Sequence, residues 1–133
     1  MSFVLCADFS IFPDNLQLGP AVTLSGMDFQ DNTGGGVSIV NQSSAVTGLQ
    51  FPDVGIEIRL PTSVQWAGMQ VGQFASPFTI EAVDSNGNVT NTFAYNKPNS
   101  YWFANHSFAD LAMLRFLGGG GEGVIVSLCI LIP

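Results

Sequence analysis

Short runs of strand-forming residues, each ended by turn residues, most restrict the fold of this chain. Apolar or alternating runs recur along the sequence, and Gly, Pro, Asn and Asp interrupt them at intervals of about ten residues. Helical periodicity is nearly absent, and the only segment that suggests a helical turn is 107–111. We therefore predict eight to nine strands, near residues 3–9, 21–29, 36–40, 54–60, 64–72, 77–83, 89–95, 111–117 and 123–131.

The segment FTIEAVDSNGNVTNTFAY, residues 78–95, carries the strongest hairpin signal. Apolar and polar residues alternate over 78–83, which is the pattern of a half-buried strand. Asn86-Gly87 then supplies the positive φ angles of a tight two-residue turn. The continuous apolar run 124–132 instead predicts a strand that is buried on both faces or shielded at an edge.

The chain length and the strand pattern together indicate the fold class. A chain of 133 residues is the size of one domain with one sizeable core, so we expect a single domain over residues 1–133. Short antiparallel strands without helical crossovers predict an all-β fold. We expect an antiparallel β-sandwich with jelly-roll topology, and closure into a barrel is the alternative.

The composition limits the possible partners. Apolar residues make up 47% and charged residues 10% of the chain, so we expect a partner or further copies of the chain to cover some of the surface. The formal net charge is −7, with only three basic residues, and nucleic acid is excluded because phosphate binding needs clustered Lys and Arg. The same deficit disfavours anionic membranes.

Neither end of the chain carries a recognisable targeting or membrane segment. The N-terminus has no positive region and too short an apolar stretch for a signal peptide. The apolar run 124–133 is too short to span a bilayer, so we expect no membrane insertion and a soluble chain.

The two cysteines, Cys6 and Cys129, lie near opposite ends of the chain, and a disulfide between them is geometrically possible if the first and last strands pair. We favour two buried free thiols, because no other feature indicates an oxidising compartment.

Several short motifs resemble one known family when they are taken in order. They are ADFS at 7–10, LSGMDF at 24–29, GIEIRLPTSVQWAGMQVG at 55–72, FTIEAVDSNGNV at 78–89 and LAMLRFLGGGGEGVIVSLCIL at 111–131. The chain resembles the galactose-binding-like jelly rolls of bacterial surface and secreted proteins, which include non-catalytic carbohydrate-binding modules. The resemblance implies an extracellular or particle-surface location. The family often has an acid where this chain has Ser127, which argues against the family's structural calcium site.

The segment NKPNSYWFANHSF, residues 96–108, concentrates aromatic and amide side chains in a turn-rich stretch that we expect to be a loop. Sugars stack on flat rings while amides bind their hydroxyl groups, so this stretch predicts a glycan site. The candidate ligand-binding residues are Tyr95, Asn99, Tyr101, Trp102, Asn105 and His106. The alternative is that the rings fill the core or an interface, since alternation places Tyr101 and Phe103 on one side and Trp102 on the other. Trp66, with Gln65, offers a second platform.

Calcium is the only cofactor that the sequence suggests. Asp28, Asp31 and Asn32 place oxygen ligands in one flexible stretch.

The sequence gives little support for a catalytic role. The single histidine, His106, has no Gly-x-Ser-x-Gly motif to act with. Glu57 and Glu81 sit at alternating strand positions and are expected on one solvated sheet face. We therefore predict that the chain is not an enzyme.

Two functions remain open. The first is a non-catalytic, lectin-like module that binds a glycan through loops at one end or through an exposed sheet face. The second is a structural or assembly protein, such as a self-associating subunit of a surface layer, a filament or a virion decoration. The low charge and the apolar C-terminal strand favour assembly as a homo-oligomer, whereas the family resemblance favours glycan binding.

Overall fold

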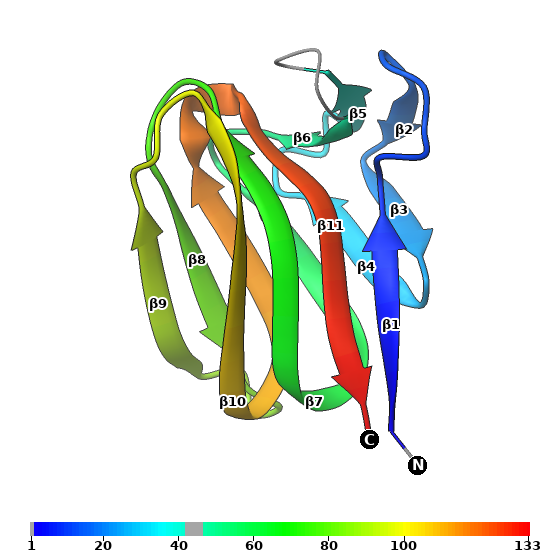
Figure 1. Cartoon of the computed structure of the whole chain (residues 1–133), viewed down its shortest axis with the longest axis vertical. Helices are drawn as coiled ribbons and strands as arrows, with labels where there is room; N and C mark the ends of the chain where they lie inside the picture. Colours follow the sequence, from blue (N-terminus) through cyan, green and yellow to red (C-terminus); the bar gives the residue numbers. More distant parts are fainter. Residues whose placement is uncertain (1, 42–46) are drawn as a thin grey trace.

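The computed structural model describes residues 2–41 and 47–133 and shows an antiparallel sheet of eleven strands folded into two layers (Figure 1). This confirms the predicted all-β sandwich, with more strands than expected. The strands are β1 (Phe3–Asp8), β2 (Gln17–Gly19), β3 (Ala21–Leu24), β4 (Met27–Asp31), β5 (Val37–Val40), β6 (Gly48–Phe51), β7 (Ile56–Gln73), β8 (Phe78–Val83), β9 (Val89–Tyr95), β10 (Ser100–Gly118) and β11 (Gly123–Ile132). A short 3-10 turn, Gly119–Gly121, joins β10 to β11.

Two long strands, β7 and β10, build both layers. They pair with each other along their whole length and turn over together at the lower end of Figure 1, where the register of the pair shifts. Residues 56–59 of β7 pair with β4 and with the C-terminal part of β10, which also pairs with β8. Residues 67–72 of β7 lie between the N-terminal part of β10 and β11. The first layer is therefore β3-β4-β7-β10-β8-β9, and the second layer has β10, β7 and β11 at its centre, flanked by β1 and β6.

Phenylalanine rings fill the space between the layers. Phe9 meets Phe29 edge-on at 4.9 Å, and Phe51 meets both Phe78 and Phe116 at about the same distance, 5.6 and 5.5 Å. All five rings are at most 2% exposed. Burying a phenylalanine contributes about 1.5–3 kcal/mol, so this cluster is a major source of stability.

Several strand boundaries differ from the sequence-based prediction. Residues 21–29 form the two strands β3 and β4, because Ser25 and Gly26 take positive φ angles of 54° and 74° and reverse the chain. The predicted strands 54–60 and 64–72 are parts of the single strand β7, and the short strands β2 and β6 were not predicted.

The aromatic segment and the predicted helical turn both belong to β10. Residues 100–118 form one strand, so the helical turn predicted at 107–111 is wrong, and the loop expected over 96–108 is limited to residues 96–99. The physical reason is pairing: β7 offers a continuous hydrogen-bonding edge to this segment, and the turn residues of the segment do not interrupt it beyond Ser100.

The hairpin over residues 78–95 is confirmed, and β9 begins and ends where it was predicted. The turn differs from the prediction. Of Asn86 and Gly87, only Gly87 takes a positive φ, 84°. The Gly87 N–H donates to the Asp84 carbonyl oxygen at 3.1 Å, and the Asp84 N–H donates to the Asn88 carbonyl oxygen at 2.9 Å. This is the longer hairpin loop in which one glycine closes a type I turn.

Cys6 and Cys129 form a disulfide, which corrects the expectation of free thiols. The first strand, β1, pairs with the last strand, β11, and the two cysteines are direct partners with Cα atoms 4.1 Å apart. Disulfides persist in oxidising environments, and this one agrees with the extracellular location that the resemblance implies. No helix in the described part of the chain is long and apolar enough to cross a membrane.

Candidate functional site

Strand alternation in β10 divides the predicted ligand-binding residues between two sides of one layer. Tyr101, Phe103 and Asn105 lie on the outer face, while Trp102 and His106 point into the space between the layers. The predicted alternation is therefore confirmed. Phe103 is the most exposed large apolar side chain in the described part of the chain, at 77%.

Trp102 belongs to the core and is not a stacking platform. Its side chain is 9% exposed and stacks on Phe78 with ring centroids 5.6 Å apart. Tyr95 lies on it at 5.5 Å, and the Lys97 ammonium is 5.4 Å from the ring centroid. Neighbouring rings cover the indole that was predicted to stack on a sugar, so Trp102 takes the core position that was the alternative prediction from the sequence.

Tyr95 and His106 form a partly buried pair between β9 and β10. The Tyr95 hydroxyl lies 2.8 Å from Nε2 of His106, and the imidazole stacks on Phe93 at 3.9 Å. Burial lowers the pKa of His106 and raises the pKa of Tyr95, so both groups are held in their neutral forms at neutral pH. Asn99 is exposed in the turn before β10, with a φ of 55°. Tyr95 and His106 therefore do not join the outer face.

The outer face of the second layer gathers aromatic and polar side chains from three strands. Phe103 and Asn105 of β10 lie opposite Gln70 and Gly68 of β7. On the other side of β7, Ser127 and Cys129 of β11 are the partners of the same two positions. The face therefore carries two cross-strand rows, Phe103-Gln70-Ser127 and Asn105-Gly68-Cys129.

Trp66 closes this face at one end because Gly68 has no side chain. A Cβ atom at Gly68 would lie 2.7 Å from the outer edge of the Trp66 indole, so the ring lies over the glycine. At the other end, Tyr101 lies over Gly72 in the same way and meets Phe74 edge-on at 4.9 Å. Glycine at these two positions of β7 thus lets large rings lie along the sheet.

A hollow of about 220 Å³ lies between Trp66 and Phe103. Its lining residues are Trp66, Gly68, Met69, Phe103, Ala104, Asn105, Ser127 and Cys129. Aromatic faces with a few amide and hydroxyl groups suit a ligand that has both C–H faces and hydroxyl groups. Tyr101 and Asn105 were predicted as ligand-binding residues, and Trp66 was predicted as a second platform. The roles of Phe103 and the two glycines were missed, since only the strand register reveals them.

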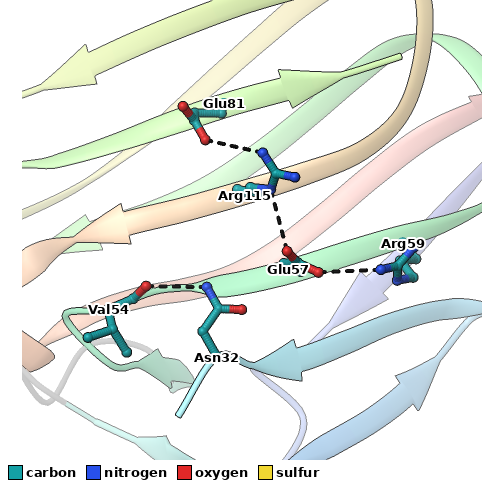
Figure 2. A network of polar contacts seen from close by, with 6 residues as sticks. All are labelled: Asn32, Val54, Glu57, Arg59, Glu81 and Arg115. Carbon is teal, nitrogen blue, oxygen red and sulfur yellow. Dashed lines mark hydrogen bonds and ion pairs between the residues drawn. The ribbon is translucent and has the colours of Figure 1, made fainter. Parts of the chain in front are cut away.

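The outer face of the first layer carries an ion-pair network (Figure 2). Arg115 lies between two carboxylates, 3.4 Å from Glu57 and 3.6 Å from Glu81, and Glu57 also pairs with Arg59 at 3.5 Å. Glu57 and Glu81 therefore share one sheet face, as the sequence predicted. The same guanidinium therefore contacts both carboxylates.

The predicted calcium ligands do not converge. Along β4, Asp28 is exposed and Asp31 is buried, so alternation sends the two carboxylates to opposite faces. Asp28 accepts a hydrogen bond from Thr23 at 2.5 Å, and the Asn32 amide donates to the Val54 carbonyl oxygen at 3.2 Å (Figure 2). Within residues 2–41 and 47–133, no three His, Cys, Asp or Glu side chains lie together as a metal site.

The Asp31 carboxylate instead organises the loop after β4. It accepts hydrogen bonds from the Thr33 N–H and the Gly36 N–H, each at 2.7 Å, and from the Thr33 hydroxyl. Burial opposes ionisation of Asp31, but these donors outweigh it and lower the pKa of the carboxyl. The donors of this loop thus contact both Asp31 oxygens, which the prediction assigned to calcium.

The chain was compared with known proteins. No family model and no curated protein matches it. The solved structures similar to it include a family 6 carbohydrate-binding module, 8% identical, with a TM-score of 0.49 over 88% of this chain and 94% of that chain. A low-affinity xylan-binding module from Roseburia intestinalis is 15% identical, with a TM-score of 0.48 over 98% and 94%. A family 32 module from C. perfringens, solved with galactose, is 12% identical, with a TM-score of 0.43 over 98% and 93%. All three of these solved structures are carbohydrate-binding modules.

Proposed function

We propose that this protein is a non-catalytic carbohydrate-binding module that binds its glycan on the outer face of β10, β7 and β11. The observation that carries the proposal is the hollow between Trp66 and Phe103, with Asn105 and Ser127 at its wall. The ligand-binding set is therefore Trp66, Tyr101, Phe103 and Asn105, with Gln70 and Ser127 as further hydrogen-bonding groups.

The chemistry of this face matches that of a sugar. A pyranose ring has an apolar C–H face, which covers the exposed Phe103 ring and the Trp66 indole. Covering a largely exposed phenylalanine contributes up to about 1.5–3 kcal/mol. The Asn105 amide and the Ser127 hydroxyl then form hydrogen bonds with the ring hydroxyls. The positions of these protein donors and acceptors set the specificity for one sugar over another.

The proposal makes the module a binding unit without its own hydrolytic site. The two glutamates that share a sheet face are paired with Arg115 on the opposite side of the sandwich from the hollow. Glycoside hydrolysis needs two carboxyl groups that flank the ligand, and none lines the hollow in the described part of the chain. The disulfide supports a secreted or extracellular location.

Tryptophan fluorescence tests the proposal directly. The chain has two tryptophans, of which Trp66 lines the hollow and Trp102 is buried. Titration with soluble polysaccharides, such as xylan, galactomannan and hydroxyethylcellulose, is expected to shift the emission of the wild type. The shift is expected to disappear in Trp66→Phe, in which only the buried Trp102 reports.

Truncation of the rings gives the matching affinity measurement. By affinity gel electrophoresis, Trp66→Ala and Phe103→Ala are each expected to weaken binding at least about tenfold. Covering a large apolar side chain contributes about 1.5–3 kcal/mol, and a loss of about 1.4 kcal/mol is a tenfold loss of affinity. Ile11→Ala is the control, because Ile11 is 73% exposed, much like Phe103, but lies outside the hollow. Equal retardation of Phe103→Ala and wild type would refute the assignment of the site.

The second candidate function is self-association through β1. In the described part of the chain, β1 pairs with β11 alone, although the Ser25 hydroxyl donates to the Cys6 carbonyl oxygen at 2.7 Å, and Phe3 and Val4 are 53% and 58% exposed. Exposed apolar edge strands favour pairing with a further strand. Light scattering over a range of concentrations separates the two functions: a monomer near 14.1 kDa removes the assembly function for the isolated chain, and a growing oligomer supports it.

A further inference from the structure

We infer that the ligand is an internal stretch of a neutral, extended polysaccharide, which lies along β7 and β11 across Trp66 and occupies a second hollow. This inference rests on the proposed function and specifies its ligand class. It specifies two properties of the ligand: its length, which is greater than a single terminal sugar, and its lack of charge.

The second hollow has a volume of about 320 Å³ and lies near the chain termini. Ser2, Ser63 and Gln65 contribute polar groups to it, and Leu131 and Pro133 contribute apolar surface. Its character is therefore like that of the first hollow, with hydroxyl and amide groups beside an apolar wall.

Both hollows lie on the same face of the second layer, one after the other along β11. Ser127 and Cys129 line the first hollow, whereas Leu131 and Pro133 line the second. Ser127, Cys129 and Leu131 are alternate residues of β11, so their side chains lie on one face with steps of about 6.6 Å, and Pro133 directly follows the strand. The two hollows thus follow the strand direction in a single line.

Trp66 lies between the two hollows on the neighbouring strand. Residues 63–65 of β7 line the second hollow, and residues 66, 68 and 69 line the first. The indole lies down over Gly68 and does not stand up as a wall between the hollows. A linear chain of sugars can therefore pass over the ring and place units on both sides, and neither hollow closes around a chain end.

The charges on the protein indicate a neutral ligand. No charged side chain lines either hollow in the described part of the chain. All three basic residues are engaged elsewhere: Arg59 and Arg115 pair with Glu57 on the first layer, and Lys97 lies over Trp102. Asp8 is the partner of Ser127 in the β1–β11 pair, which places a carboxylate beside the first hollow. With a net charge of −7, the surface disfavours uronic or sialic acids.

Calorimetric titration with a length series of neutral oligosaccharides tests this inference. The probes are the monosaccharide to the hexasaccharide of whichever neutral polysaccharide binds most tightly. Affinity is expected to rise at least about tenfold from the disaccharide to the hexasaccharide. The double variant Gln65→Ala, Leu131→Ala is expected to weaken hexasaccharide binding at least about fivefold and to leave disaccharide binding unchanged, since it changes only the second hollow.

A charge series completes the test, with polygalacturonate and alginate as anionic probes beside the neutral polymers. Binding of the neutral polymers alone supports the inference. A monosaccharide that binds as tightly as the hexasaccharide, or an anionic polymer that binds more tightly than the neutral ones, overturns it and leaves the carbohydrate-binding function standing. Failure of every saccharide to bind overturns the proposed function as well, so the two failures are distinguishable.

Discussion

The disulfide closes nearly the whole chain into one loop. Its removal is therefore expected to destabilise the fold strongly. Cys6 and Cys129 are separated by 123 positions. For a loop of this length, the loss of loop-closure entropy in the unfolded chain amounts to about 5 kcal/mol, and native disulfides typically contribute about 2–5 kcal/mol. We therefore expect Cys6→Ser, Cys129→Ser to lower the free energy of unfolding by about 4 kcal/mol.

The same loss is measurable as a shift in melting temperature. Unfolding entropy is about 2.1 cal/mol/K per residue, so the 133-residue chain gains about 0.28 kcal/mol/K on unfolding, and a loss of about 4 kcal/mol lowers Tm by about 14 °C. Guanidinium unfolding of the wild type and the double variant, with and without reductant, gives both numbers. Reductant is expected to affect only the wild type. A double variant within about 1 kcal/mol of the oxidised wild type would refute the loop-entropy reasoning.

Three further predictions concern the core and the ionisable groups. Gly123→Ala is expected to cost about 1–3 kcal/mol in guanidinium unfolding, because the new Cβ would lie 2.2 Å from the buried Phe51 ring. Asp31→Asn is expected to cost about 1–3 kcal/mol by the same assay, since it turns a carboxylate that accepts several hydrogen bonds into an amide. With Asp31 intact, its lowered pKa gives stability that is present above pH 3.8 and lost as the pH falls through the folded-state pKa. The lowered pKa of His106 means that the unfolded chain binds the proton more readily, so stability is expected to decline as the pH falls below about 6.5. His106→Gln should flatten this decline between pH 7 and pH 5, and an unchanged slope would contradict the assignment.

Local sequence patterns predicted the elements whose signals lie within a few residues. The hairpin over 78–95 was predicted because alternation and Gly87 act locally, and β9 matched its prediction. β10 was mispredicted in its first half, because Pro98 and the asparagines of 96–108 suggested a loop. The pairing of residues 100–107 with β7, whose partner residues lie 27–41 positions earlier in the chain, overrode that local preference.

The candidate site was only partly predictable for the same reason. Alternation in β10 correctly placed Tyr101 and Phe103 opposite Trp102, but it did not say which side was buried. That choice depends on which face of β10 meets β9 and Phe78, and these contacts come from other parts of the chain. The aromatic segment therefore contributes both to the core and to an exposed face: Trp102 belongs to the core, and Phe103 belongs to the exposed face.

By itself, the sequence determined the all-β class, the period-2 faces of the strands and the lack of basic groups for anionic partners, because these depend on residue type and on near neighbours. Only the tertiary structure decided that Cys6 meets Cys129 and that Asp28 and Asp31 diverge within a packed sheet. It also decided that Trp66 lies beside the outer face of β10. The physical reason is that strand order and register join segments far apart in the chain, and the pairing that satisfies all backbone hydrogen bonds and buries the phenylalanine core is a property of the whole fold.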